Sequence, residues 1–359
     1  MKKVGIMTMH RIVNYGSFLQ AYCLKKEIER TGSTVEFVDY KFDSQLEGIE
    51  ERKNFIWKLI EHKNIFNYIK YKKHAKKFKN KYDDYLKQYL NVSSNMNYNY
   101  NLDSLVIGSD EVFNCMQPYP VGYSKNLFGF GYEKINVISY AASFGNTTYK
   151  KLFEYKIDKE IGNMLSKFKS ISVRDINSFV IVKKLIKINP KVHFDPVLIG
   201  DFSKEINEID NIKLSNYIVV YAYPNRLLKE EKKYIKKFAK KYNKIIVSLG
   251  FYQDIADYNL IVNPFLALKY IKRADYVITD TFHGTVFSIK MNTKFCTIIR
   301  NSNYNKLNSL LEELKHLNQE VINLDNIKKI YLENISFEES NRIIESETEN
   351  TKKYLMHNV

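Results

Sequence analysis

A lone histidine followed by a glycine ends a polar turn in the stretch Ile278-Thr-Asp-Thr-Phe-His-Gly284. The residues from Thr285 onward have helical spacing, so His283 and Gly284 stand where a helix is expected to begin. Free backbone N–H groups at a helix start favour an anion. Such a histidine is more often structural, but an imidazole there can also bind a phosphate or carboxylate, or move a proton near neutral pH.

Three further cations follow apolar segments. Arg174 comes directly after Ile171–Val173, and an arginine there is costly to bury unpaired. Either Asp175 and its neighbours neutralise Arg174, or Arg174 binds an anionic ligand through two hydrogen bonds. Arg300 ends a later apolar segment and Lys306 opens the next helix, on the same predicted edge as His283. Because Ser-His-Asp and H-E-x-x-H spacings are absent, we expect an anionic substrate rather than a metal or a covalent nucleophile.

Two polar turns near the amino terminus offer a second group of candidates. The first, His10 to Ser17, brings amide, hydroxyl and glycine residues to a helix start, although Asn14 or Ser17 could simply cap that helix. The second follows a strand and contains Ser109, Asp110 and Glu111. These acids could hold a sugar hydroxyl or act as a base, or could merely cap a helix and suit its dipole.

The elements that would position these residues alternate between strand and helix. Strands are expected at 3–9, 35–40, 104–107, 137–141, 171–173, 192–194, 218–223, 244–249, 276–279 and 295–299, with helices at 17–30, 229–242, 265–273, 285–291 and 305–316. The alternation predicts two doubly wound α/β domains that face each other across a cleft. We place the N-terminal domain at 1–205 with a basic helical insert at 45–100, the C-terminal domain at 206–330, and a closing helix at 331–359.

Composition narrows the class of protein. The net charge of +16 admits nucleic acid, an anionic membrane or an anionic substrate as partner, but a Lys-, Asn- and Ile-rich composition can produce the same surplus. The stretch Arg52–Lys87 is basic and has helical apolar spacing, which usually indicates a solvated helix face and can also indicate membrane contact. Without an 18-residue apolar run or a signal peptide, we expect a cytoplasmic protein in peripheral contact with the inner membrane face.

Six motifs in order resemble the polysaccharide pyruvyl transferase family. They are GIMTMHRIVNYGSFLQAY (5–22), VIGSDEVFN (106–114), SYAASFG (139–145), ISVRD (171–175), DPVLI (195–199) and ITDTFHGTVFSI (278–289). The resemblance implies two Rossmann-like domains of GT-B type. It also implies transfer of a pyruvyl group from phosphoenolpyruvate to a sugar as a ketal, in the synthesis of capsule, exopolysaccharide or cell-wall polymers. Phosphoenolpyruvate would then be a co-substrate, with no cofactor and no metal.

The resemblance also suggests roles for the candidate residues. Donor binding falls to Arg174, His283, Gly284, Thr285, Arg300 and Lys306, and acceptor binding to His10, Asn14, Tyr15, Gly16, Ser109 and Asp110. His283, Asp110 and Glu111 would supply the acid and base. The expected acceptor is a lipid-linked sugar, and no nucleic acid is expected. Two alternatives stay open: a GT-B glycosyltransferase that uses a nucleotide sugar, and a non-catalytic protein that binds anions or RNA.

Overall fold

The computed structural model describes residues 1–46, 65–99, 101–117 and 121–359. The part of the basic insert at 47–64 lies outside the described residues. Residues 65–90 of the insert form the long helix α3 (Ile65–Tyr85) and a π-helical turn at Leu86–Leu90, and residues 91–99 are irregular.

Two parallel sheets organise the described part of the chain, as the alternation predicts. The first contains β1 (Lys3–Met7), β2 (Thr34–Phe37), β3 (Ser104–Asp110), β4 (Asn136–Ala142), β5 (Ser172–Val173) and β6 (Lys191–Val192), in the order β2-β1-β3-β4-β5-β6. The second contains β7 (Tyr217–Tyr221), β8 (Ile245–Leu249), β9 (Tyr258–Leu260), β10 (Tyr276–Thr279) and β11 (Phe295–Thr297), in the order β11-β10-β7-β8-β9. The strands within both sheets pair in parallel, and β9 was not predicted from the sequence.

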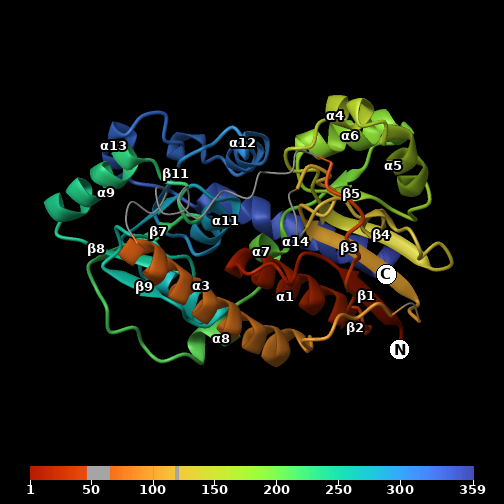
Figure 1. Cartoon of the computed structure of the whole chain (residues 1–359), viewed down its shortest axis with the longest axis horizontal. Helices are drawn as coiled ribbons and strands as arrows, with labels where there is room; N and C mark the ends of the chain where they lie inside the picture. The colour runs from red at the N-terminus through yellow and green to blue at the C-terminus, as the bar shows by residue number, and fades with distance from the viewer. Residues whose placement is uncertain (47–64, 100, 118–120) are drawn as a thin grey trace.

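Helices connect and cover these strands (Figure 1). In the N-terminal part they are α1 (Tyr15–Glu29), α3, α4 (Tyr149–Glu154), α5 (Asp158–Leu165), α6 (Ile176–Ile186), α7 (Pro196–Ile199) and α8 (Ser203–Asn207). In the C-terminal part they are α9 (Lys229–Lys241), α10 (Pro264–Lys272), α11 (Phe282–Lys290), α12 (Tyr304–Glu313), α13 (Asp325–Leu332) and α14 (Glu338–Asn358). No helix in the described ranges is long and apolar enough to cross a membrane.

Each sheet has a point at which its strand order reverses. In the first sheet this point lies between β1 and β3, and in the second between β7 and β10. Ligands of doubly wound sheets bind beyond the carboxyl ends of the strands at such points. Most of the predicted site residues lie at the carboxyl ends of β1, β3 and β10, at the two reversal points, whereas Arg174 follows β5 and Arg300 and Lys306 follow β11.

The two sheets share one continuous apolar core. Phe18 and Tyr140 from the first half belong to the same buried cluster as Tyr221, Phe265 and Phe287 from the second. Helix α14 returns to the first sheet, where the hydroxyl of Tyr354 donates to the carbonyl of Ser139 at 2.9 Å. Burial of this shared surface holds the two halves together.

Helix α3 also bridges the two halves (Figure 1). The ring of Phe78 lies 5.0 Å from that of Tyr15 in α1 and 6.0 Å from that of Phe251, which follows β8. The hydroxyl of Tyr82 donates to the carbonyl of His10 at 2.8 Å. Part of the apolar face of α3 is therefore buried against the protein, whereas Phe66 and Ile69 near its start are exposed and its lysines remain at the surface.

Candidate active site

Arg174 lies just after β5 in a buried position. Its Nη1 donates to Asp195 Oδ2 at 2.7 Å, and its Nη2 lies 3.6 Å from Asp110 Oδ1. The guanidinium stands 4.2 Å from the centre of the Phe282 ring, a cation–π contact with the opposite domain. Nε and Nη2 are buried and have no hydrogen-bond partner in the described structure. Arg174 thus keeps two donors for a ligand while Asp195 offsets its charge.

His283 occupies the first turn of α11, as predicted, and is buried. Its Nε2 lies 3.5 Å from Asp195 Oδ2, which is long for a strong hydrogen bond, and has no closer partner among the described residues. A Cβ on Gly16 would lie 2.2 Å from Cγ and Nδ1 of the His283 ring. Gly16 therefore allows α1 of one domain to contact His283 of the other.

Asp195 contacts both Arg174 and His283 and is the residue that sequence reasoning missed. In the sequence it stands out only as the first residue of the motif DPVLI (195–199), directly after the strand expected at 192–194. The structure places its carboxylate between Arg174 and His283, with the side chain fully buried. Burial opposes its ionisation, but His283 and Arg174 more than compensate and lower the pKa of Asp195. Asp195 could have been identified as a candidate site residue from its position directly after a predicted strand, which is how Arg174 was identified.

Asp110 and Ser17 form the polar side of the same site. The hydroxyl of Ser17 donates to Asp110 Oδ2 at 3.2 Å, and the Oδ1 of Asn14 accepts the backbone N–H of Ser17 at 2.8 Å. Asn14 therefore caps α1 as well as supporting Ser17. The backbone of Asp110 has a φ of 76°, a value that residues other than glycine rarely adopt. Such backbone conformations occur more often at functional sites.

Glu111 and Lys306 form an ion pair across the two domains. Glu111 Oε2 also accepts the side-chain amide of Asn114 at 2.6 Å. Burial alone would raise the pKa of Glu111, but Lys306 and Asn114 outweigh it and lower the pKa to about 2. The Lys306 ammonium lies 5.8 Å from the centre of the Phe282 ring, which also contacts Arg174. Lys306 thus approaches the Arg174 group from the C-terminal domain.

Arg300 lies in a separate ion cluster within the C-terminal domain. Its Nη1 and Nη2 donate to Glu231 at 2.8 and 2.6 Å, and its Nε lies 3.8 Å from Asp280 Oδ2. Arg226, which follows β7, places its Nε 3.0 Å from the same Asp280 oxygen. Burial raises the pKa of Asp280 even though both arginines oppose the rise. The two arginines are thus largely neutralised by the two acids.

The remaining predicted residues make internal contacts. His10 Nδ1 lies 3.1 Å from the carbonyl of Thr8, and its Nε2 lies 3.4 Å from Asp39. The hydroxyl of Tyr15 donates to the carbonyl of Val262 at 2.7 Å, which joins α1 to the second domain. The other contacts are Ser109 Oγ to Gln20 Oε1 at 2.7 Å, Gly284 N to Thr281 Oγ1 at 2.9 Å, and Thr285 Oγ1 to Thr297 Oγ1 at 2.9 Å.

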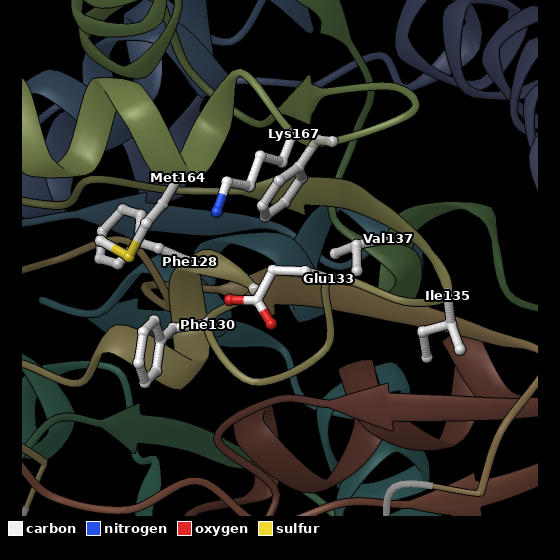
Figure 2. A pocket seen from close by; sticks show the side chains of 9 residues that line it. Phe128, Phe130, Glu133, Ile135, Val137, Met164 and Lys167 are labelled. Atoms are coloured by element: carbon white, nitrogen blue, oxygen red, sulfur yellow. The ribbon is translucent and has the colours of Figure 1, made fainter.

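The structure therefore brings Arg174, His283, Asp110, Glu111 and Lys306 to one junction between the domains. No group of three His, Cys, Asp or Glu side chains suited to a metal ion occurs within the described ranges. A small pocket elsewhere in the first domain is lined by Phe128, Phe130 and Met164 among others, and contains none of the predicted site residues (Figure 2).

Comparison with known proteins gives both a family and a fold. A family model described as polysaccharide pyruvyl transferase matches residues 14–303. No curated protein matches the sequence. The glycotransferase of kitacinnamycin superposes with a TM-score of 0.52 at 8% identity, and the alignment covers 100% of this chain and 99% of the glycotransferase chain.

Two sugar-nucleotide proteins have similar structures. S. aureus MnaA, solved with UDP, has a TM-score of 0.50 at 11% identity and covers 99% of this chain and 97% of its own. A putative UDP-N-acetylglucosamine 2-epimerase from Listeria monocytogenes has a TM-score of 0.50 at 10% identity, with coverages of 95% and 90%. At these identities the likeness shows the fold, which is the GT-B arrangement of two parallel-sheet α/β domains.

Proposed function

The chain belongs to the polysaccharide pyruvyl transferase family, and from that premise we propose that it transfers a pyruvyl group from phosphoenolpyruvate to a sugar. The chain is a transferase, and its family supports pyruvyl transfer in polysaccharide synthesis. The proposal adds that the donor is phosphoenolpyruvate and that the acceptor is a lipid-linked sugar with two free hydroxyls. The observation that carries it is the junction where Arg174 and His283 meet from opposite domains with unsatisfied buried donors.

Phosphoenolpyruvate matches the chemistry of that junction. It is a small anion with one phosphate and one carboxylate, and Arg174 retains two free donors for planar recognition of such groups. His283 adds a buried ring nitrogen, and Lys306 adds an ammonium from the same domain. Buried polar atoms normally have partners, so unsatisfied donors in one place support an anion as ligand.

The proposed reaction requires three proton transfers. A proton is added to the methylene carbon of phosphoenolpyruvate, and the first sugar hydroxyl forms a bond to the neighbouring carbon as it loses its own proton. The carbon–oxygen bond to phosphate then breaks, and inorganic phosphate leaves. The second hydroxyl attacks the resulting oxocarbenium-like carbon and loses its proton, which closes the ketal.

The side chains divide between these tasks according to their positions. His283 is suited to donate the proton or to hold the donor phosphate, because its Nε2 is buried beside Asp195. Asp110 is suited to the acceptor, because it is partly accessible and Ser17 already donates a hydrogen bond to its carboxylate. Glu111 is a weaker candidate for the base while Lys306 holds its pKa near 2.

A lipid-linked acceptor would place the reaction at a membrane surface. Helix α3 exposes Lys70, Lys73, Lys76 and Lys77, and these lysines make no ion pair with any described residue. Phe78 and Tyr82 on its other face are buried. We propose that this exposed basic face contacts anionic lipid headgroups.

The test of the donor uses purified protein with phosphoenolpyruvate and a panel of lipid-linked sugars. The wild type should release phosphate only when a suitable sugar is present. Arg174→Ala and His283→Ala should each lose about 30- to 1,000-fold in turnover while remaining folded, because each removes a hydrogen bond from a charged group to a buried anion. Arg174→Lys should restore little of the turnover that Arg174→Ala loses, because a point charge replaces the planar guanidinium.

Two outcomes would overturn the proposal. Near-normal turnover in both alanine variants would place the donor site elsewhere. Thermal stabilisation by nucleotide sugars, with none by phosphoenolpyruvate, would favour a glycosyltransferase instead.

A further inference from the structure

A buried carboxylate lies between the two groups that we assign to the anionic donor. Asp195 Oδ2 accepts from Arg174 Nη1 at 2.7 Å and lies 3.5 Å from His283 Nε2. Its Oδ1 accepts the backbone N–H of Val197 at 3.1 Å, so Asp195 also caps α7. The side chain has no exposed surface. One carboxylate therefore contacts side chains from both domains at their junction.

Helix capping does not explain the negative charge of this residue. Asn and Ser cap helices about as well as Asp, and neither would repel an anionic substrate. A carboxylate beside the donor opposes donor binding, because like charges repel strongly where water is excluded. Its charge must therefore serve something other than the helix or the affinity for the donor.

The geometry around Asp195 indicates what the charge does. Arg174 reaches it from β5, and His283 reaches it from the start of α11. Arg174 uses Nη1 for this contact, while Nε and Nη2 have no hydrogen-bond partner in the described part of the protein, although Nη2 lies 3.6 Å from Asp110 Oδ1. On its other side the His283 ring is confined by Gly16, where even a Cβ would clash.

We propose that Asp195 is a positioning residue of the donor site, which holds Arg174 and His283 at a fixed separation across the domain boundary. This role rests on the proposed function, because it assumes that both side chains meet the donor. The carboxylate weakens ground-state affinity for the anion and in exchange fixes two groups for the transition state. Precise placement matters because a displacement of about 1 Å can reduce the rate about 100-fold.

The test separates donor affinity from turnover. Asp195→Asn keeps an oxygen that can cap α7 but removes the charge. Calorimetric titration with phosphoenolpyruvate should give a Kd that is lower than, or within about threefold of, that of the wild type, whereas kcat should fall about 100-fold. Asn263→Ala is the matched control, because Asn263 caps α10 away from the site and its loss should affect stability alone.

A second variant covers the case in which Asp195→Asn does not fold. Asp195→Glu retains the charge for Arg174 but moves the carboxylate by one methylene. Its kcat should fall at least about tenfold, with donor affinity within about threefold of the wild-type value.

The outcomes are distinct. A wild-type kcat in the folded Asp195→Asn variant would show that Asp195 only caps α7. The same result in Asp195→Glu would show this if Asp195→Asn does not fold. Parallel losses of affinity and kcat would show a general structural role, and both results overturn the proposal. If wild-type protein gives no binding heat with phosphoenolpyruvate, the proposed function itself fails, and the positioning role fails with it.

Discussion

Replacement of Lys306 by methionine tests the contact between the domains and the donor site together. Lys306 pairs with Glu111 from the opposite domain, and both side chains are mostly buried. Methionine keeps the length and the apolar stem of lysine but removes the charge. The variant leaves Glu111 buried with Asn114 as its remaining side-chain hydrogen-bond partner in the described structure. We expect lower stability and weaker donor binding, through separable effects.

The pKa of Glu111 sets the size of the stability effect. The pKa is lowered from 4.5 to about 2 in the folded protein. A depressed carboxylate pKa stabilises the fold above the unfolded-state pKa, and this contribution is lost as the pH falls through the folded-state pKa. A shift of this size corresponds to about 3 kcal/mol at neutral pH. The difference in unfolding free energy between wild type and variant should therefore be on the order of 3 kcal/mol at pH 7 and shrink as the pH falls from 4.5 through about 2.

Urea unfolding at several pH values measures this difference, and two variants serve as controls. The double variant Lys306→Met with Glu111→Gln removes both charges and should regain most of the stability, because a neutral buried pair costs less than one unpaired charge. Lys125→Met removes a cation that pairs with Glu160 at the surface, and should cost at most about 1 kcal/mol.

The donor effect should not recover in the double variant. Loss of one charged hydrogen bond should weaken phosphoenolpyruvate binding about 10- to 150-fold in both the single and the double variant. If the single variant is as stable as the wild type at pH 7, the ion pair does not support the fold. If the double variant recovers donor affinity as well as stability, Lys306 acts only through Glu111 and is not a donor ligand.

Two further predictions concern the contact of α1 with His283 and the exposed face of α3. Gly16→Ala should reduce turnover about 100-fold, because the new methyl would displace the His283 ring. In the control Gly162→Ala the nearest atom to the new Cβ is 3.5 Å away, so turnover should not change. Normal turnover in Gly16→Ala would show that the ring position does not matter. Changing Lys70, Lys73, Lys76 and Lys77 to glutamine should abolish co-sedimentation with anionic vesicles, and changing the exposed α9 lysines Lys233, Lys236, Lys237 and Lys240 should not. Equal wild-type binding to neutral and anionic vesicles, or equal loss in both lysine variants, would contradict a specific contact by α3.

Much of the fold follows from periodicity that the sequence displays. The apolar runs predicted most strands within a few residues, and the GT-B arrangement is confirmed. Strand β9 was missed because Tyr258–Leu260 is only three residues long and contains an asparagine. Helix α11 begins at Phe282, earlier than expected, because the side chain of Thr281 caps it.

The candidate site was predictable where a strand end alone decides the position of a side chain. Arg174 and His283 were found in this way, and the sheet topology brings them together. Side-chain pairing was not predictable from local sequence. Arg300 follows β11 as expected, but Glu231 at the start of α9 forms two hydrogen bonds with it. Asp195 was missed because its two partners come from different domains.

The two C-terminal basic side chains of the site each lie beside an N-terminal carboxylate. His283 lies next to Asp195, and Lys306 pairs with Glu111. Under the proposed function, an anionic donor that contacts His283 and Lys306 must compete with carboxylates that also hold the domains in contact. Donor binding and the domain junction therefore share the same charges, and a change in one alters the free energy of the other. Under the proposed function, this coupling accounts for the position of the donor site between two domains rather than within one.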